Sequence, residues 1–406
     1  MLGSKDILLS MKHQGGLMPQ EEMLEVPHKK GDLYIGIPKE TSFQEHRIAL
    51  VPDAVALLTA NGHQIVVETN AGKEANYDDK DYSEAGARIA YSTEEVYKAD
   101  IILKVAPPSL EEIEFLQRKQ TLISALQFTI QPENYVKKLM EKKVNAIAFD
   151  FIRDDEGVYP VIRSMSEIAG TASVLIAAEN LSNINNGQGS IFGGITGIAP
   201  TEVVIIGAGT AGEFAARAAI GLGANVKVFD DKLSRLRRLQ SNIGSRIYTS
   251  VIQPHVLAKA LTTADVVIGA IRAPEGRTPC VVSEEMVSDM KFGSVIIDIS
   301  IDQGGCFATS QVTNHTKPTF RKYGVTHYCV PNIASRVSRT ASLALSNVLS
   351  PIILDMGERG GMESMLRKDK GVRHGVYIYN GILTNQFLGE TFNLPYKDID
   401  LIMAVI

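Results

Sequence analysis

The sequence predicts an α/β protein made of two doubly wound, mainly parallel sheets, and two observations carry the prediction. Short apolar segments alternate with helical patterns from Leu33 to about residue 152, and a second series of the same kind begins at Thr201. Strands that alternate with helices form parallel sheets covered on both faces. A chain of 406 residues, 45% of them hydrophobic, is long enough to form two such domains.

The first series supplies five expected strands. They share apolar or β-branched composition and flanking turn residues, and they cover 33–40, 63–69, 100–105, 121–127 and 144–152. A helix is expected over 52–60, because proline near its first turn and Asn61-Gly62 after it are typical helix boundaries. Ser109 followed by Glu112 indicates a capping box at the start of another helix.

The second series, preceded by an expected helix over 166–181, supplies the segments EVVIIGAG, NVKVFD, DVVIGAI and SVIIDISI, with a last strand over 327–330. A long helix from Ser335 would cross back to the first domain and make that domain discontinuous. We therefore expect an N-terminal extension (1–31), a discontinuous substrate domain (32–160 plus 338–406) and a nucleotide-binding domain (161–337) inserted in it. The extension has no clear pattern, and its alternative is a short helix that packs on a neighbouring subunit.

Composition narrows the class of protein. The formal net charge is −5, which gives no electrostatic reason to expect a nucleic-acid or anionic-membrane partner. No uninterrupted apolar run approaches the roughly 18 residues that span a bilayer, and the N-terminus lacks a secretory pattern. Three cysteines do not suggest a disulfide framework, so a cytoplasmic protein is expected.

The strongest motif is VVIIGAGTAG, which places Gly207, Gly209 and Gly212 as G-x-G-x-x-G between an apolar strand and an alanine-rich helix. The first glycine allows a tight turn, the second lets the backbone approach a pyrophosphate, and the third lets helix and strand pack closely. The phosphates would lie at the helix N-terminus, where free N–H groups favour anions. The following Thr210 and Ala211 are further candidate contacts.

An acid follows at the spacing that a dinucleotide site needs. Asp230 ends the segment NVKVFD, about 18 residues after Gly212, close to the roughly 20 expected for the acid that binds the ribose hydroxyls. A carboxylate there favours NAD over NADP. Lys232 and Arg235 follow at once, so NADP stays open, although a solvated helix face explains these cations equally well. A glycine-rich turn without a ligand is the alternative to the whole site.

Five polar residues stand at or just after expected strand ends, where sites form in such sheets. They are Arg47, Lys104, Gln127, Asp302 and Asn332. Lys104 interrupts an apolar strand and is expected to point into a cleft, its alternative being a charge at a sheet edge. Arg47 could hold a carboxylate through two hydrogen bonds, unless it is a surface arginine. Asp302, beside Gly304-Gly305, could orient an amine or activate water, unless it only forms a turn.

Metal and thiol chemistry find little support. The eight histidines show no H-x-x-x-H spacing, and no C-x-x-C pair occurs, so no metal is assigned. Cys306 has no visible partner base and is interpreted as a buried or loop thiol.

Seven motifs together resemble the alanine dehydrogenases and, more distantly, the nucleotide-binding part of proton-translocating transhydrogenase. They run from about residue 33 to the C-terminal region and read GIPKET..EHR (36–47), LKV.PP (103–108), MSEIAG (165–170), FGGITGIAP (192–200), VIGAGTAG (205–212), DISIDQGG (298–305) and the passage from Asn332 into the long helix. The resemblance implies oxidative deamination of L-alanine to pyruvate and ammonia with hydride passing to NAD. It also implies a homo-oligomer, most often a hexamer.

The resemblance also assigns roles to individual residues. Arg47 resembles the arginine that holds the substrate carboxylate, Lys104 the substrate-binding lysine, and Asp302 the aspartate that assists the amine and the water. Met165 and Asn332 match positions that line the cleft. Ser166, Asp230, Asp302 and the three glycines match positions of the nucleotide site.

One departure matters for catalysis. The segment that ends in a catalytic histidine in alanine dehydrogenases reads TLISALQF here, so Gln127 takes the histidine's position. Glutamine can form hydrogen bonds but cannot act as an acid or base near neutral pH. If the histidine is needed for proton transfer, we expect one of three consequences. Turnover is slower, Lys104 or Asp302 transfers the proton instead, or the substrate is a different one.

Three hypotheses therefore stay open. The first is an alanine dehydrogenase, which accounts for Arg47, Lys104 and Asp302 together. The second is a transhydrogenase-like hydride-transfer subunit, which need not bind an amino acid. The third is an NAD(H)-binding protein whose catalytic site lapsed at Gln127.

Overall fold

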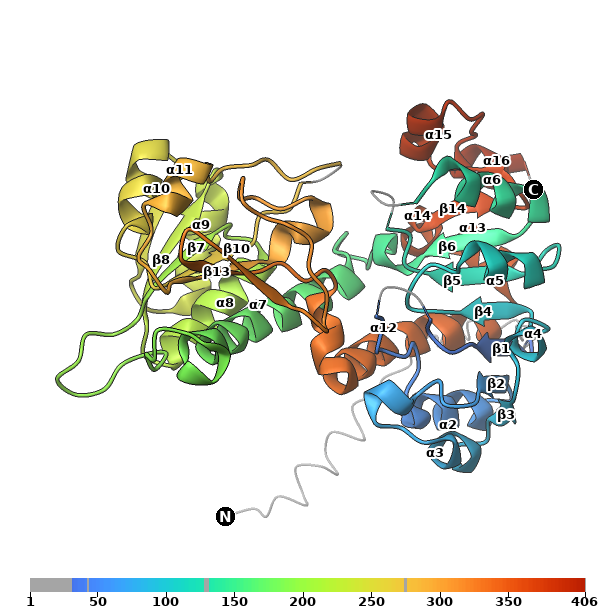
Figure 1. Ribbon diagram of the computed structural model, residues 1–406. Coiled ribbons are helices and arrows are strands. Elements are labelled where there is room, and N and C mark those ends of the chain that lie inside the picture. The colour runs from blue at the N-terminus through green and yellow to red at the C-terminus, as the bar shows by residue number, and fades with distance from the viewer. Residues whose placement is uncertain (1–30, 42–43, 128–130, 274–275, 406) are drawn as a thin grey trace, which may run out of the picture.

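The computed structural model describes residues 31–41, 44–127, 131–273 and 276–405, which form two lobes (Figure 1). Two long helices, α7 (Pro160–Leu181) and α12 (Ser338–Glu358), run through the region between the lobes. Nearly all of the expected N-terminal extension, residues 1–30, lies outside the described residues.

The first lobe is built on an eight-stranded sheet of order β15-β14-β6-β5-β4-β1-β2-β3. Six strands are parallel, and β14 and β15 join antiparallel at one edge. The strands are β1 (Tyr34–Ile37), β2 (Gln64–Glu68), β3 (Arg88–Ala90), β4 (Ile101–Leu103), β5 (Thr121–Ser124), β6 (Asn145–Ala148), β14 (Val376–Tyr379) and β15 (Ile382–Leu383). The last two come after the second lobe in sequence, so the first lobe is discontinuous, as expected.

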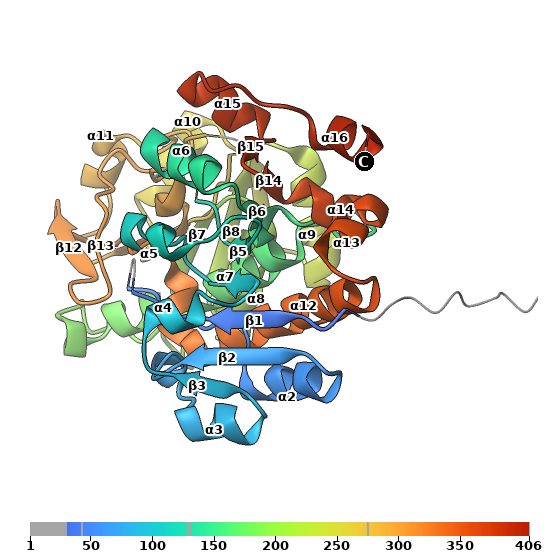
Figure 2. The same cartoon turned by 90° about the vertical axis from the view of Figure 1, so that its right-hand side faces the viewer.

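Helices cover both faces of this sheet because side chains along each strand alternate between two apolar clusters. In β4, Ile101 and Leu103 pack with α12, whereas Ile102 packs on the opposite face. Figure 2 shows α12 beside β1, and α13 to α16 on the same lobe. The remaining helices are α2 (Pro52–Ala60), α3 (Asp79–Glu84), α4 (Thr93–Val96), α5 (Leu110–Phe115), α6 (Glu133–Lys142), α13 (Met362–Lys368), α14 (Lys370–His374), α15 (Gln386–Phe392) and α16 (Ile399–Val405).

The second lobe is built on a seven-stranded sheet of order β12-β13-β11-β10-β7-β8-β9. The chain order reverses between β7 and β10, which is the position where ligands bind in doubly wound sheets. Its elements are β7 (Glu202–Ile206), α8 (Thr210–Gly221), β8 (Asn225–Asp230), α9 (Leu233–Ile243), β9 (Tyr248–Val251), α10 (Pro254–Leu261), β10 (Val266–Gly269), α11 (Glu284–Ser288), β11 (Val295–Asp298), β12 (Thr319–Lys322) and β13 (Val325–Tyr328). Only β12 is antiparallel to its neighbour.

The predicted fold class is confirmed, while several predicted element ends are wrong. The strands expected over 33–40, 100–105 and 121–127 end at residues 37, 103 and 124, where the chain turns into the loops that carry polar side chains. The last strand begins at Val325 rather than at residue 327. Helix α7 begins at Pro160, six residues earlier than expected, because proline suits the first helical turn. The domain boundaries after residues 160 and 337 stay a prediction.

Two helices of the described chain are long and apolar enough to cross a membrane by length and composition alone. They are α7 and the segment 333–358, and 44% of each apolar window is buried inside the protein. Core helices pass the same test, and both helices contribute buried residues to the apolar clusters of the lobes. The search of the sequence for an uninterrupted apolar run therefore missed these two segments, whose mean hydropathy is high although polar residues interrupt them.

Candidate active site

Three of the five polar residues expected at strand ends come from the two lobes and meet between them. The loop after β1 supplies Glu45 and Arg47, and the loops after β11 and β13 supply Asp302 and Asn332. Asn332 joins the two sets, because its Nδ2 donates to Glu45 Oε2 at 2.7 Å and its main-chain N–H donates to Asp302 Oδ1 at 2.9 Å. Three of the five residues that we singled out are thus in one hydrogen-bonded group.

Arg47 is buried and pairs with Glu45, so it is not a surface arginine. Its Nε donates to Glu45 Oε1 at 2.7 Å and its Nη2 donates to Oε2 at 2.6 Å. Its Nη1 lies 3.2 Å from the sulfur of Met165, a residue predicted to line the cleft. Burial raises the pKa of Glu45, but the charge and hydrogen bonds of Arg47 outweigh burial and hold that pKa below its ordinary value. Both groups are therefore ionised at neutral pH.

Asp302 lies in the short 3-10 turn Ile299–Gln303 that follows β11, and Gly304 ends the turn with φ +96°. Its side chain keeps contact with solvent. Protein atoms around the carboxylate nevertheless raise its pKa, against the Asn332 N–H and the charges of Arg47 and Arg272. A carboxylate that is accessible and easier to protonate than usual can accept a proton from a bound amine or water.

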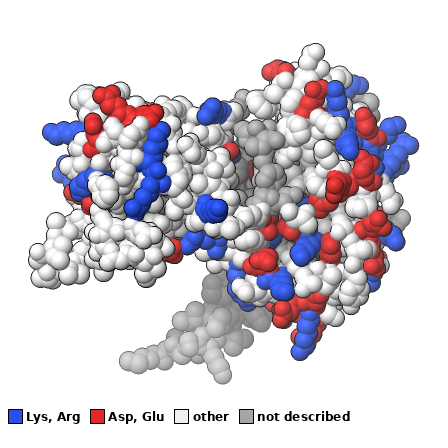
Figure 3. Space-filling view, viewed as in Figure 1, with Lys and Arg blue, Asp and Glu red and all other residues white. Residues whose placement is uncertain are grey.

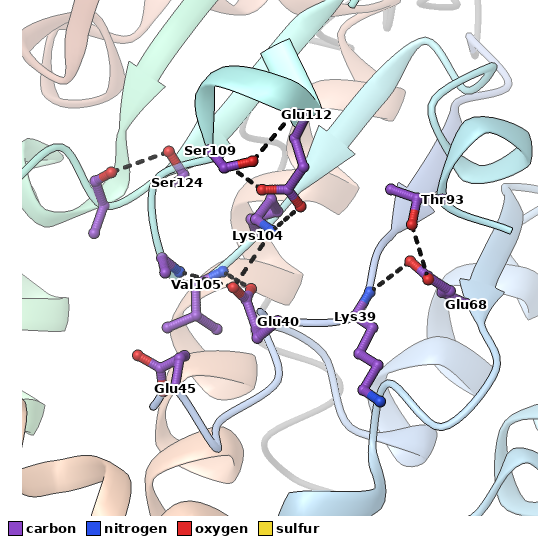
Figure 4. A network of polar contacts seen from close by, with 12 residues as sticks. Lys39, Glu40, Glu45, Glu68, Thr93, Lys104, Val105, Ser109, Glu112 and Ser124 are labelled. Atoms are coloured by element: carbon purple, nitrogen blue, oxygen red, sulfur yellow. Dashed lines mark hydrogen bonds and ion pairs between the residues drawn. The ribbon is translucent and has the colours of Figure 1, made fainter. Parts of the chain in front are cut away.

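Lys104 does not point into an open cleft, which corrects the sequence-based expectation. It lies just after β4, its side chain is 0% exposed, and its Nζ donates to Glu112 Oε1 at 2.6 Å. Glu40 Oε2 lies 3.6 Å from the same nitrogen. Figure 4 shows the Lys104 ammonium between these two carboxylates. The pairing explains how the lysine is buried: burial lowers its pKa, but the two glutamates outweigh burial and keep the ammonium charged.

Glu112 serves two structures at once. Its Oε2 accepts from the Ser109 N–H at 2.7 Å and completes the capping box at the start of α5, as the sequence predicted. Its Oε1 holds Lys104. The start of α5 therefore fixes the position of the lysine (Figure 4).

Gln127 lies three residues beyond the end of β5, with φ +50°. Its Oε1 is buried and has no hydrogen-bond partner among the described residues. The neighbouring Leu126 N–H donates to Asp150, whose pKa is raised to about 6, chiefly by burial. Arg272, from the loop after β10, is close enough for its charge to act on both Asp150 and Asp302. An unsatisfied buried amide beside titratable groups is typical of a functional position.

The glycine loop has the geometry that its motif predicts. Gly207 has φ +114°, and a Cβ on Gly212 would lie 1.8 Å from the Gly207 carbonyl oxygen, so helix and strand approach as closely as glycine allows. A Cβ on Gly209 would meet nothing within 4 Å. Thr210 and Ala211 form the first turn of α8, where unpaired N–H groups can bind a phosphate.

Asp230 ends β8 next to this loop and is 2% exposed. Its Oδ2 accepts from the Ala208 N–H at 2.7 Å and its Oδ1 from the Lys232 N–H at 2.8 Å. Arg235 Nη1 lies 3.7 Å from the same carboxylate. Ser166 lies on α7, one turn before Gly170, whose Cβ position is 2.2 Å from the Ala211 carbonyl oxygen. Apart from Asp302, the residues that we predicted for the nucleotide therefore lie on segments that meet at the start of α8.

Five charged residues of the site were not singled out from the sequence as site residues. They are Glu40, Glu45, Glu112, Asp150 and Arg272. Glu40 and Glu45 lie inside the motif GIPKET..EHR, and two glutamates so close to an arginine were the available signal. Among the residues that the structure describes, no group of three or more His, Cys, Asp and Glu side chains could hold a metal ion.

Comparison with known proteins gives one consistent family. The family models for the N-terminal and C-terminal domains of alanine dehydrogenase/PNT match residues 36–169 and 173–386. Alanine dehydrogenase 2 of Staphylococcus aureus strain USA300 is 37% identical over 367 residues, which are 90% of this chain and 98% of the relative.

Two solved structures have the same fold. An L-alanine dehydrogenase superposes with a TM-score of 0.83 at 35% identity, covering 88% of this chain and 99% of its own. A transhydrogenase from Sinorhizobium meliloti superposes with a TM-score of 0.75 at 24% identity, covering 86% of this chain and 99% of its own, and is similar in fold alone. The chain therefore belongs to the alanine dehydrogenase/PNT family and is an enzyme of the dehydrogenase, or oxidoreductase, type.

Proposed function

We propose that this enzyme oxidises L-alanine to pyruvate and ammonia with NAD as hydride acceptor. The observation that carries the proposal is the group formed by Arg47, Asn332 and Asp302 between the lobes, to which Lys104 is connected through Glu40. A cation for the carboxylate and an acid for the amine are the two groups that an α-amino acid requires. The identity to alanine dehydrogenase 2 supports the same choice.

Each residue has a role in this proposal. Arg47 holds the substrate carboxylate, and Met165 and Asn332 line the cleft. Lys104, which Glu40 and Glu112 enclose in this structure, contacts the reacting end of the substrate when the complex forms. Asp302 orients the amine and accepts a proton from the attacking water. Gln127 can donate a hydrogen bond to the substrate where a histidine would transfer a proton.

NAD is the proposed cofactor, and it supplies the hydride acceptor when bound. The residues fit it: the open side of Gly209 admits a pyrophosphate, the start of α8 offers N–H donors, and Asp230 is next to the loop to receive ribose hydroxyls. The carboxylate disfavours a 2′-phosphate. Arg235 Nη1 lies 3.7 Å from the Asp230 carboxylate and 3.9 Å from that of Asp231, so these two groups partly balance the charge of the arginine.

A homo-oligomer in the cytoplasm is part of the same proposal, and the resemblance to the family suggests a hexamer. Residues 182–201 contain no charged side chain and expose four isoleucines: Ile184, Ile191, Ile195 and Ile198. Figure 3 shows this segment as an uncharged projection from the second lobe. An exposed apolar patch of this kind favours contact with a second copy. Light scattering on the purified protein would give the mass, and a monomer would contradict this part.

A lapsed NAD(H)-binding protein is the second candidate, and Gln127 favours it specifically. A site without the histidine binds the nucleotide equally well but lacks one proton-transfer group. The transhydrogenase-like alternative has no comparable support, since that similarity extends to the fold alone.

One assay separates these candidates. Purified protein is mixed with NAD and L-alanine, with glycine, L-serine and no substrate in parallel, and the reverse reaction is run with pyruvate, ammonia and NADH. Absorbance follows NADH. Turnover selective for alanine is the expected result. NADH binding by fluorescence without turnover in either direction would contradict the proposal and favour the lapsed site or a different substrate.

A further inference from the structure

Five charged side chains form one buried group in the first lobe, which we call the charge cluster. It consists of Glu40, Glu45, Arg47, Lys104 and Glu112. Their side chains are 6%, 1%, 10%, 0% and 9% exposed. Three carboxyl groups therefore face two cations. A buried set with one carboxylate in excess stabilises itself by taking up a proton.

The hydrogen bonds identify which carboxyl group holds that proton. Glu45 accepts three hydrogen bonds from Arg47, two of them from the guanidinium, and one each from Asn332 and the Ser335 hydroxyl. Glu112 accepts from Lys104 at 2.6 Å. Glu40 has only the longer contact of 3.6 Å to Lys104, and its other partners are the main-chain N–H groups of Val105 at 2.5 Å and Ala106 at 3.3 Å (Figure 4). Glu40 is thus the carboxyl group with the weakest cationic partner.

The surroundings of Glu40 agree with this assignment. Burial raises its pKa to about 7, although Lys104 and the Val105 N–H oppose burial; the carboxylates of Glu45 and Glu112 raise it further. Arg47 and the phenol of Tyr97 also face it. Glu40 can therefore take up and release a proton near neutral pH, which a glutamine at position 127 cannot do.

Oxidation of an amino acid needs such a group. The substrate enters as an ammonium ion, and one proton must leave its nitrogen before the hydride can leave the neighbouring carbon. We propose that Glu40, acting through Lys104, takes up this proton and so supplies the base function that Gln127 lacks. This inference rests on the proposed function.

The transfer balances in protons and charge. A proton of Lys104 Nζ first passes to Glu40 Oε2. The lone pair that this frees on Nζ then accepts a proton as an N–H bond of the substrate ammonium breaks. Lys104 is an ammonium before and after, the substrate becomes a neutral amine, and Glu40 becomes a neutral carboxyl group. The 3.6 Å contact shortens to hydrogen-bond length for the transfer, as contacts between catalytic groups commonly do when the substrate complex forms.

The first test is the pH dependence of kcat/KM for L-alanine. In the wild-type protein it should rise with pH through an inflection near 7, because only ionised Glu40 accepts the proton. Glu40→Gln should lower kcat/KM by about 10²-fold or more and remove the inflection. NADH affinity and the melting temperature of this variant are measured alongside and should stay close to wild type. An inflection that survives in Glu40→Gln would overturn the proposal.

Glu112→Gln is the matched control, because it also removes one negative charge beside Lys104 but leaves Glu40 in place. It also keeps the proposal testable if Glu40→Gln does not fold. The inflection should persist and move to lower pH, because one of the charges that raise the pKa of Glu40 is gone. Loss of the inflection, or a shift to higher pH, would contradict a base at Glu40.

A variant that restores the histidine at position 127 gives an independent test of the role of Glu40. In Gln127→His the family's acid–base group is restored, so adding Glu40→Gln should cost much less than it costs alone. Two groups with one function are expected to be non-additive in this way. Equal losses in both backgrounds would overturn the inference.

A measurement without turnover separates failure of this inference from failure of the proposed function. Infrared spectra recorded across neutral pH, as wild type minus Glu40→Gln, should contain a carboxylic-acid band that disappears with a midpoint near 7. If alanine is not oxidised but the band is present, only the proposed function fails. If alanine is oxidised and the band is absent, the assignment of the base to Glu40 fails.

Discussion

At the scale of single residues, charged side chains of the first lobe are already hydrogen-bonded to one another without a ligand. Glu45 uses Nε and Nη2 of Arg47, while Nη1 has only the sulfur of Met165. A guanidinium carries five N–H donors, so the Nη1 side of Arg47 keeps donors for a substrate carboxylate. Pairing with Glu45 fixes the plane of the guanidinium without using all of its donors.

Lys104→Ala should abolish turnover and leave NADH binding nearly intact, since the lysine lies in the first lobe and the glycine loop in the second. It should also lower the free energy of unfolding by about 3–5 kcal/mol, because two buried carboxylates lose their cation. Turnover, NADH fluorescence titration and urea unfolding measure the three effects.

Lys98→Ala is the control for that substitution, because Lys98 is an exposed lysine of the same lobe. All three quantities should stay at wild-type values. A substantial loss of NADH affinity in Lys104→Ala would instead make Lys104 part of the nucleotide site.

The sequence predicts which side chains matter more readily than it predicts their partners. A lysine inside an apolar segment was conspicuous, but its partner Glu40 is 64 positions away and becomes a neighbour only when β1 and β4 pair. The pairing of Glu45 with Arg47, two residues apart, depends on a loop conformation that no periodic pattern specifies. The sequence therefore indicated that Lys104 is important, but it could not predict that the lysine is buried between two glutamates.

At the scale of elements, the start of α8 combines two glycines with opposite requirements. A side chain on Gly212 would collide with main-chain atoms of Gly207, so this position serves the fold. Gly209 has free space around it, so the position serves whatever approaches the loop.

Gly209→Ala should therefore fold normally but bind NADH at least about 10-fold more weakly, because the added methyl group occupies the approach to the pyrophosphate. Gly221→Ala is the matched control: it lies at the other end of α8, and its Cβ position is equally open. Fluorescence titration and thermal unfolding of both variants provide the comparison. Equal NADH affinity in the two variants would exclude a phosphate contact at Gly209.

The turn that carries Asp302 is held by the aspartate at the end of β11. Asp298 is 1% exposed and accepts hydrogen bonds from the N–H groups of Ser300 and Cys306 and from the Ser310 hydroxyl at 2.6 Å. Burial outweighs these bonds and raises its pKa to about 6. The turn is therefore anchored by a carboxyl group that is easier to protonate than an ordinary aspartate.

Stability should depend on pH through this residue. Because the folded-state pKa is raised, the contribution of Asp298 is fully favourable below about pH 4 and is lost as pH rises through about 6. The loss amounts to at most about 3 kcal/mol. Asp298→Asn should flatten the decrease in urea-unfolding free energy over this window, while Asp289→Asn, an exposed aspartate of the same lobe, should leave it unchanged. An unchanged slope in Asp298→Asn would assign the pH dependence to other groups.

Element types were predictable and element ends were not, for a physical reason. Apolar composition continues through the residues after β4 and β5 because the loops there are buried, so the pattern does not mark where pairing stops. The capping box at Ser109 was predictable because its chemistry is local.

For the whole molecule, two alternating series were enough to predict two doubly wound lobes. The return of α12 to the first lobe was also expected. The strands β14 and β15 were not, because they are short, antiparallel and separated by a large sequence interval from β6, the strand that they extend. A hairpin that joins the edge of a parallel sheet from a distant part of the chain leaves no periodic pattern in the sequence.

Asn332 connects the lobes and gives the last prediction. It adopts φ +56°, and its side chain and main chain bind residues of different lobes, Glu45 and Asp302. Asn332→Gly suits this backbone conformation and keeps the main-chain bond to Asp302, so it removes only the side-chain link. A hydrogen bond to a carboxylate contributes about 1.5–3 kcal/mol, so kcat/KM for alanine should fall by at least about 10-fold at unchanged NADH affinity.

Asn186→Gly provides the matched control, since Asn186 also has a left-handed backbone (φ +57°) but is exposed outside this hydrogen-bonded group. Asn186→Gly should melt at or slightly above the wild-type temperature, because glycine relieves the strain at positive φ. Asn332→Gly should melt at or below it, because this variant also loses the hydrogen bond to Glu45. If both also keep wild-type kcat/KM, the Glu45–Asn332 bond does not align the lobes for catalysis. A loss confined to Asn332→Gly means that alignment of Arg47 with Asp302 depends on one amide that spans the two lobes.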